Sequence, residues 1–219
     1  MNAVETPGQT SPKANPASNQ TGSGPGSPAD ATPVFVSLEF TPNPSTLKYV
    51  VNRTLLAVGA ANFTSKEKAD ENSPLAAKLF EIPGVVAVMV GRDFVTVTKG
   101  SSGDWETLNR KSTEIIKEHA ASGQPSVTGD ITTGHTASTS SAADTEIETK
   151  IKKILDEQVR PAVAMDGGDI VFDRFENGIV FLHMQGSCSG CPSSTATLKM
   201  GIETRLKQAI PEVQEVVAV

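Results

Sequence analysis

Cysteine is scarce in this chain, because its 219 residues contain only Cys188 and Cys191. Positive charge is also limited: 19 Lys and Arg stand against 25 Asp and Glu, which gives a net charge of −6. Proteins that bind nucleic acid or anionic membranes concentrate positive charge, so we expect neither kind of partner. Hydrophobic residues make up 37% of the chain. Ordinary globular chains reach about 45–50% when glycine is counted, so part of this sequence is not core.

Targeting and membrane-spanning signals are missing from the sequence. No apolar run approaches the ~20 residues that cross a bilayer, and the first 30 residues lack the apolar stretch of a secretory signal. Arg53 is the first arginine, so the Arg-rich presequence typical of mitochondrial import is absent as well. These absences predict a soluble protein of a bacterial-type cytoplasm, with the mitochondrial matrix as the less favoured location.

Two stretches hold too few apolar residues to form a core. Residues 1–32 contain five Pro and four Gly but no Leu, Ile, Phe, Tyr or Trp, and residues 122–144 contain five Ser and five Thr without helical or strand periodicity. Such segments cannot offset the entropy lost on ordering. The sequence therefore predicts a disordered leader (1–32), a first domain (33–121), a flexible linker (122–144) and a second domain (145–219).

Hydrophobic periodicity predicts an α+β fold for the first domain. Apolar residues alternate over 34–40, and two β-branched runs at 85–90 and 94–98 are separated by a short turn, as in a hairpin. Ser73 before Pro74 and Asp104 before Trp105 each indicate the start of a helix, and Trp105 is expected to pack rather than to contact a cofactor. Further extended chain is expected over 48–51 and toward residue 63.

The second domain has the pattern helix, β-hairpin, helix, strand. Thr145 and Glu148 form a capping box before a helix that should end or kink at Pro161. Asn177-Gly178 is a strong hairpin turn between the strand runs 170–175 and 179–184. A helix is expected from Pro192 to about Ile210, followed by a strand over 213–219. We therefore predict two small α+β domains, the second with its helices on one face of a small sheet.

The candidate site is the loop Gly186-Ser187-Cys188-Ser189-Gly190-Cys191-Pro192. Two cysteines at this spacing can direct both sulfurs at one metal centre, and the helix start after them should lower the thiol pKa and so favour the metal-binding thiolate. The small residues around the cysteines would let backbone amides approach the sulfides of a cluster. These candidate neighbours of the metal are Gly186, Ser187, Ser189 and Gly190.

The number of available ligands indicates assembly of two chains. Iron–sulfur clusters and structural zinc usually take four protein ligands, and one chain supplies two cysteines. His119 lies in the other domain, His135 in the linker, and His183 is interpreted as an ordinary strand residue. The simplest four-ligand site is a symmetric dimer in which each subunit contributes Cys188 and Cys191.

Spacing alone leaves alternatives open at this loop. A thioredoxin-like dithiol oxidoreductase also places a C-x-x-C pair between a strand and a helix, although the β-α-β unit and the aromatic neighbour are missing here. A zinc-bridged structural dimer is a third reading. Asp166-Gly167-Gly168-Asp169 could suggest a carboxylate metal site, but a turn from helix to strand, with glycine at positive φ, explains it better.

The second domain resembles the C-terminal domain of NifU, and the first is similar to the N-terminal domain of Nfu proteins. The first resemblance covers essentially residues 147–219. It is carried by Pro161-x-Val163-x-x-Asp166-Gly167-Gly168-Asp169, Gly186-x-Cys188-x-Gly190-Cys191-Pro192-Ser193-Ser194, Thr197-Leu198-Lys199, Gly201-Ile202-Glu203 and Ile210-Pro211-Glu212-Val213. The second is carried by Thr41-Pro42-Asn43-Pro44, Thr46-Leu47-Lys48, Ser73-Pro74-Leu75-Ala76 and Ile82-Pro83-Gly84-Val85.

The resemblance implies an iron–sulfur cluster scaffold or carrier rather than an enzyme. A cluster, with [4Fe-4S] favoured, would be held between two subunits by Cys188 and Cys191 and delivered to apo-proteins. Client proteins and an upstream assembly scaffold are the implied partners, and the first domain is assigned to recognising client or donor proteins. Full-length NifU carries further cysteines upstream that this chain lacks, so building clusters from free iron and sulfide is not expected of it.

Overall fold

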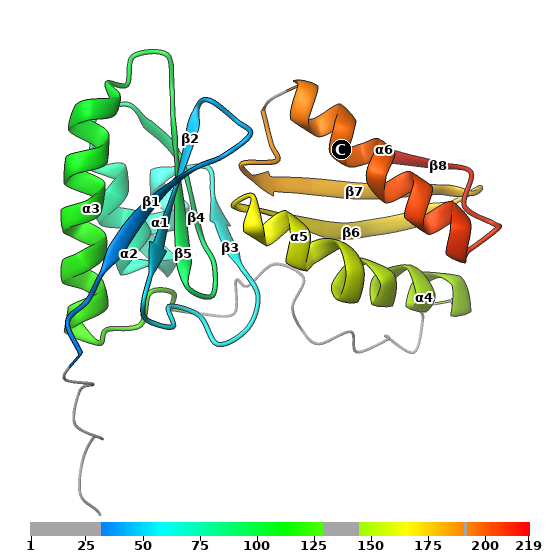
Figure 1. The fold of residues 1–219 in the computed structure, drawn as a ribbon, viewed down its shortest axis with the longest axis horizontal. Helices are drawn as coiled ribbons and strands as arrows, with labels where there is room; N and C mark the ends of the chain where they lie inside the picture. Colours follow the sequence, from blue (N-terminus) through cyan, green and yellow to red (C-terminus); the bar gives the residue numbers. More distant parts are fainter. Residues whose placement is uncertain (1–31, 129–144, 191) are drawn as a thin grey trace, which may run out of the picture. The chain divides into compact units, whose positions relative to one another are not determined.

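A computed structural model describes residues 32–128, 145–190 and 192–219 (Figure 1). These residues form a five-stranded and a three-stranded sheet, each with its own helices, which confirms the predicted α+β class. Nearly all of the predicted leader and most of the predicted linker lie outside the described residues, so their disorder stays a prediction. None of the described helices is both long and apolar enough to cross a membrane.

The five-stranded sheet of the N-terminal domain is antiparallel throughout and has the order β1-β2-β5-β4-β3. The predicted hairpin is β4 with β5, which confirms the pairing of those two runs. β1 lies at one edge and pairs with β2 in unbroken register from Val36↔Val51 to Phe40↔Leu47. The strands are β1 (Val36–Phe40), β2 (Thr46–Val51), β3 (Ala61–Phe63), β4 (Val85–Val90) and β5 (Phe94–Lys99).

Three helices pack against one face of this sheet: α1 (Lys66–Asn72), α2 (Pro74–Phe80) and α3 (Trp105–Ser122). The two predicted caps are confirmed, because Ser73 Oγ accepts from Ala76 N–H at 3.0 Å and Asp104 Oδ2 accepts from Thr107 N–H at 2.9 Å. The sequence interpretation missed α1, which buries only Ala69 and so shows no apolar period.

The chain after α3 returns to the N-terminal domain. Ser126 is buried, its carbonyl accepts from Ser73 Oγ at 2.5 Å, and its hydroxyl lies 3.1 Å from His119 Nε2. Thr128 N–H donates to Asn72 O at 2.7 Å. The first described residues of the predicted linker therefore contact the junction of α1 and α2.

The buried His119 should make the N-terminal domain less stable in mild acid. Burial lowers the His119 pKa below its usual 6.5, with Lys78 acting in the same direction, so the folded state binds the proton less readily than the unfolded state. The contribution of neutral His119 to the free energy of unfolding is complete above the pKa of about 6.5 that the residue has in the unfolded state. This contribution is lost as the pH falls toward the lower pKa of His119 in the folded state. Trp105, the single tryptophan, lies in this domain and can report its unfolding. We expect the urea midpoint to fall between pH 7.5 and 5.5, and to fall less in His119→Gln.

The C-terminal domain has a three-stranded sheet in the order β6-β7-β8, covered by helices on one face. β6 (Gly168–Glu176) and β7 (Ile179–Gly186) are antiparallel, and β8 (Glu215–Ala218) runs parallel to β7. Asn177 and Gly178 have φ of 51° and 82°, which confirms the predicted tight turn between β6 and β7.

The first helical run of this domain does not end at Pro161, and the irregularity predicted there is a π-helical stretch within the run. It consists of α4 (Glu146–Ile154), a π-helical stretch η1 (Leu155–Val159) and α5 (Arg160–Met165). A proline lacks the N–H that an α-helix would use, and the wider π turn directly before Pro161 takes up the irregularity. The capping box is confirmed: Thr145 N–H donates to Glu148 Oε2 at 2.8 Å, and Glu148 N–H donates to Thr145 Oγ1 at 3.2 Å.

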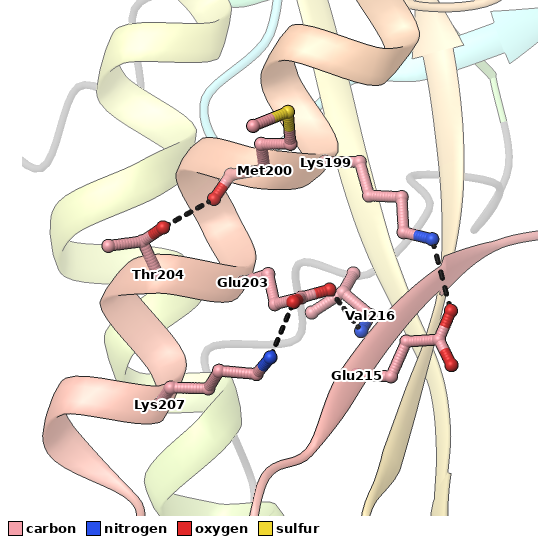
Figure 2. A network of polar contacts seen from close by, with 7 residues as sticks. All are labelled: Lys199, Met200, Glu203, Thr204, Lys207, Glu215 and Val216. Carbon is pink, nitrogen blue, oxygen red and sulfur yellow. Dashed lines mark hydrogen bonds and ion pairs between the residues drawn. The ribbon is translucent and has the colours of Figure 1, made fainter.

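The last helix, α6 (Pro192–Ala209), follows the cysteine loop and packs over the sheet. Figure 2 shows two polar links from α6 to β8. Glu203 Oε2 accepts from Val216 N–H at 3.1 Å, and Lys199 Nζ lies 3.2 Å from Glu215 Oε1. The core of this domain comes entirely from its own residues: Ile151, Leu155, Val159, Val163, Ile170, Val180, Leu182, Cys188, Ile202, Leu206, Ile210, Val213 and Val216.

Candidate functional site

The cysteine loop connects the end of β7 to the start of α6. Its described part runs from Gly186 to Gly190, and Cys191 lies outside the described residues. Within the loop, Cys188 N–H donates to Gln185 O at 3.3 Å, and Thr195 Oγ1 of α6 donates to Cys188 O at 3.0 Å. The backbone of Cys188 is therefore tied both to the strand before it and to the helix after it.

The turn between α5 and β6 anchors the loop from the other side. Ser187 N–H donates to Gly167 O at 3.1 Å, and Ser187 Oγ donates to Asp166 O at 2.6 Å. Ser187 is only 2% exposed. The sequence interpretation placed Ser187 beside the metal only as a small residue, whereas the structure makes it the attachment of the loop to Asp166-Gly167.

Two glycines of the loop adopt the left-handed backbone conformation that favours glycine. Gly186 and Gly190 have φ of 62° and 79°, and open space surrounds the position where Gly190 would carry a Cβ. Ser189, between Cys188 and Gly190, donates from N–H and from Oγ to Gly186 O at 3.2 and 2.9 Å. The loop is thus compact at Gly186 and open at Gly190.

Gly168 is a site residue that the sequence interpretation missed. A Cβ at Gly168 would lie 2.2 Å from Cys188 Sγ and 3.1 Å from Gln185 O, so the absence of a side chain makes room for the sulfur. Gly167 has the positive φ, 78°, that the turn interpretation required. Sequence spacing carried no signal for Gly168, because 20 residues separate it from Cys188 and only the pairing of β6 with β7 brings them together.

The Cys188 thiol lies in an environment that disfavours its charged form. Cys188 is 7% exposed and belongs to the core of the C-terminal domain. Burial raises the pKa of the Cys188 thiol to about 11; the Ser187 hydroxyl opposes this rise, and the carboxylates of Asp166 and Asp169 add to it. The sequence predicted a lowered thiol pKa, and at Cys188 the shift has the opposite direction, because burial is its largest cause.

Asp169, the last residue of the glycine turn, lies beside Arg160 rather than in a metal site. Arg160 Nε lies 3.6 Å from Asp169 Oδ1 and donates to Ile170 O at 3.0 Å, while its Nη1 lies 2.7 Å from Asp156 Oδ1. Across the described ranges, no three His, Cys, Asp or Glu side chains cluster as metal ligands. These contacts agree with the turn interpretation of Asp166-Gly167-Gly168-Asp169.

The histidines in the described part of the chain are engaged elsewhere. His119 lies against Ser126 in the N-terminal domain. On β7, His183 Nδ1 lies 3.1 Å from the carbonyl oxygen of Val219. His183 is an exposed strand residue, as expected, and its Nε2 lies 3.8 Å from Asp173 Oδ1. His135 falls outside the described residues. Cys188 and Cys191 therefore stay the candidate ligands that this chain offers.

Comparison with known proteins identifies the family of both domains. Residues 151–217 match the model of the NifU-like domain, and residues 36–123 match that of the scaffold protein Nfu/NifU N-terminal domain. Among solved structures, a NifU-like protein from Saccharomyces cerevisiae covers 48% of this chain and 94% of that one, with a TM-score of 0.43 at 20% identity.

Curated relatives extend the match over both domains. The human protein described as NFU1 iron-sulfur cluster scaffold homolog, mitochondrial, is 42% identical over 184 residues and covers 84% of this chain and 71% of its own length. NifU-like protein 5, mitochondrial, of Arabidopsis thaliana is 40% identical over 185 residues and covers 84% and 67% respectively. These matches confirm the resemblance seen in the sequence motifs, and the chain belongs to the Nfu/NifU family.

Proposed function

We propose that this protein is an iron–sulfur cluster scaffold that binds a cluster through Cys188 and Cys191 and delivers it to apo-proteins. The observation that carries the proposal is the fit of Cys188: its sulfur fills the space left by Gly168, and Ser187 ties its loop to Asp166 and Gly167. The cluster is cargo in this account. No bond in an organic substrate is made or broken, so the proposal contains no enzymatic step.

Ligand number supports a dimer that shares one cluster. A [4Fe-4S] or [2Fe-2S] cluster usually takes four thiolates, and two subunits would supply them as two C-x-x-C pairs around a twofold axis. We favour [4Fe-4S]. Sharing also provides a route for release, because separating the subunits removes half of the ligands and leaves the cluster open to the thiolates of a client.

The high pKa of Cys188 gives loading a definite proton balance. A thiol of pKa about 11 is protonated at neutral pH, and the metal-bound form is the thiolate, so binding iron at Cys188 expels one proton to solvent. The same raised pKa makes Cys188 a weak attacking thiol near pH 7, whereas Cys191, its partner in the thioredoxin-like alternative, lies outside the described residues. A zinc-bridged dimer would use the same four cysteines, so a measurement of the bound metal is needed to distinguish it from the proposed cluster.

We assign the N-terminal domain to recognising partners, namely clients and an upstream assembly scaffold. The domain has its own core, and the Ser126 hydroxyl that lies beside His119 Nε2 is buried inside it, away from any substrate. A cytoplasmic location stays a prediction from the sequence, since the curated relatives named above are described as mitochondrial.

Removing the N-terminal domain should slow cluster transfer without affecting cluster binding. A chain of residues 129–219 keeps the whole core of the C-terminal domain and omits residues 123–128, which contact the other domain. In the full chain, a client held by the N-terminal domain would meet the cluster at an effective concentration on the order of millimolar. The measurement is the rate at which an apo [4Fe-4S] client is activated by each holo-protein at equal cluster concentration. Equal rates across a panel of clients would remove the recruiting role.

A further inference from the structure

The outer edge of β1 carries main-chain groups without a strand partner. β1 is the last strand of its sheet, and within the described ranges no strand pairs with its outer side. Phe35 O accepts from Asn52 N–H on the β2 side. Because pairing alternates along an antiparallel ladder, the N–H and C=O groups of Val36, Leu38 and Phe40 point away from β2.

Among the described residues, this edge has few of the features that usually protect an edge strand. Native edges are shortened, bulged, charged, interrupted by proline or covered, and β1 has five residues in regular register with no proline and one charged residue, Glu39. The edge strand of the other sheet shows the contrast, since the side chain of Glu203 accepts the Val216 N–H of β8 (Figure 2). β1 instead exposes apolar side chains: Phe40 is 87% exposed and Leu38 is 38% exposed.

An apolar groove borders this edge within the N-terminal domain. It has a volume of about 460 Å³, and Leu38 and Phe40 line it together with Trp105 at the start of α3. Leu38 and Phe40 lie opposite Tyr49 and Leu47, so they continue the core-facing side of the sheet beyond the cover of the helices. An added strand could thus hydrogen-bond to β1 and place alternate side chains in the groove.

The charges at the groove favour a basic segment. Glu106 is the single ionisable residue in the lining, and Asp104 lies two positions before it. Hydrogen bonds from Thr107 lower the pKa of Asp104, which keeps this carboxylate charged. Lys99 offsets part of this charge, with its Nζ 5.5 Å from the centre of the Trp105 ring. Because Lys99 is set against Asp104, the Glu106 carboxylate leaves the groove with a net negative charge.

We propose that β1 and this groove bind an extended segment of a partner protein, which adds a strand to the sheet and combines alternating apolar side chains with a Lys or Arg. The inference rests on the proposed function only in identifying that partner as a client or donor of the cluster. A second copy of this chain is a different occupant, and a helical ligand would leave the edge of β1 unpaired.

The test uses the full chain and a displayed library of random 12-residue peptides. We expect the enriched peptides to alternate apolar and polar residues and to carry Lys or Arg. Phe40→Lys should weaken their binding at least tenfold, whereas Val58→Lys, at a residue that is 56% exposed and outside the groove lining, should not change it. Glu106→Gln should weaken it by a smaller factor. The emission of Trp105 during urea unfolding checks that the variants are folded.

N-methylated versions of one enriched peptide test strand addition directly. One version is methylated at the odd-numbered amides and the other at the even-numbered amides. One of the two should no longer bind and the other should bind nearly unchanged, because an added strand turns alternate N–H groups toward β1. The proposal would be overturned if the two methylated peptides bound equally well or if the bound peptides were helical. It would also be overturned if the library gave no enrichment or if Phe40→Lys did not weaken binding. Dimers that dissociate on Phe40→Lys would overturn it in favour of a second copy.

Iron and sulfide content of the same variants is measured in parallel. A chain that binds peptide but no cluster would contradict the proposed function and leave this inference standing.

Discussion

Gly168→Ala should deprive the C-terminal domain of most of its cluster while leaving the domain folded. The added Cβ would lie 2.2 Å from Cys188 Sγ and 3.1 Å from the main-chain oxygen of Gln185, so the sulfur must move. Adding a methyl group to a packed site typically costs about 1–3 kcal/mol. A ligand shifted by the width of a methyl group no longer meets the geometry that a cluster requires. We expect iron and sulfide per chain to fall several-fold.

Gly201→Ala is the matched control for this substitution. Gly201 lies in α6 with nothing within 4 Å of its Cβ position, so the same methyl group meets open space. It should stabilise the domain by about 0.5–1 kcal/mol through helix propensity. Full cluster content in Gly168→Ala would show that the packing of Gly168 against Cys188 has no part in binding. Far-UV circular dichroism during heating separates lost binding from lost folding.

Replacing either cysteine by alanine should abolish cluster binding and leave the apo fold intact. Cys188 is one member of a core that α4, α5, α6 and the sheet supply, so its loss should cost only about 1 kcal/mol. In a domain of this size that cost lowers the melting temperature by roughly 4–8 °C. The measurements are the visible absorption of the reconstituted protein and its melting curve by circular dichroism.

The two cysteine variants also separate a carrier from a structural metal protein. A structural zinc site contributes its binding energy to folding, so the metal-free chain would be unfolded. Collapse of the apo fold in Cys188→Ala or Cys191→Ala would therefore favour the zinc-bridged dimer. A folded variant that still binds a full cluster would show that other residues are the ligands.

Much of the fold followed from local signals in the sequence. Ser73, Asp104 and Thr145 start helices because each side chain accepts a free N–H of the first turn. Asn177-Gly178 turns the hairpin because both residues adopt positive φ. These features depend on a few neighbouring residues, which is why sequence reasoning finds them. The candidate cysteines were likewise visible from their spacing and motif.

The features that were missed depend on distant residues. A β-bulge near Asp173 shifts the register of β6 against β7 by one residue, and this shift pairs Gly168 with Gly186. Without the bulge, Gly168 would lie opposite Ser187 instead of Gly186. The high pKa of Cys188 arises from tertiary burial, whereas the sequence showed only the helix start beside it. Pro161 indicated an irregularity at this place in the sequence, but not that a π turn would let the helix continue through it.

Metal analysis after anaerobic reconstitution with iron, sulfide and zinc determines which metal centre the two cysteines hold. A [4Fe-4S] cluster shared by two chains requires about two iron and two sulfide per chain, whereas a shared zinc requires about half a zinc. We expect two iron and two sulfide per chain, bound to a dimer, and neither metal nor sulfide in Cys188→Ala. Zinc alone at half an equivalent, or a metal-free chain that reduces disulfide substrates, would contradict the proposed function.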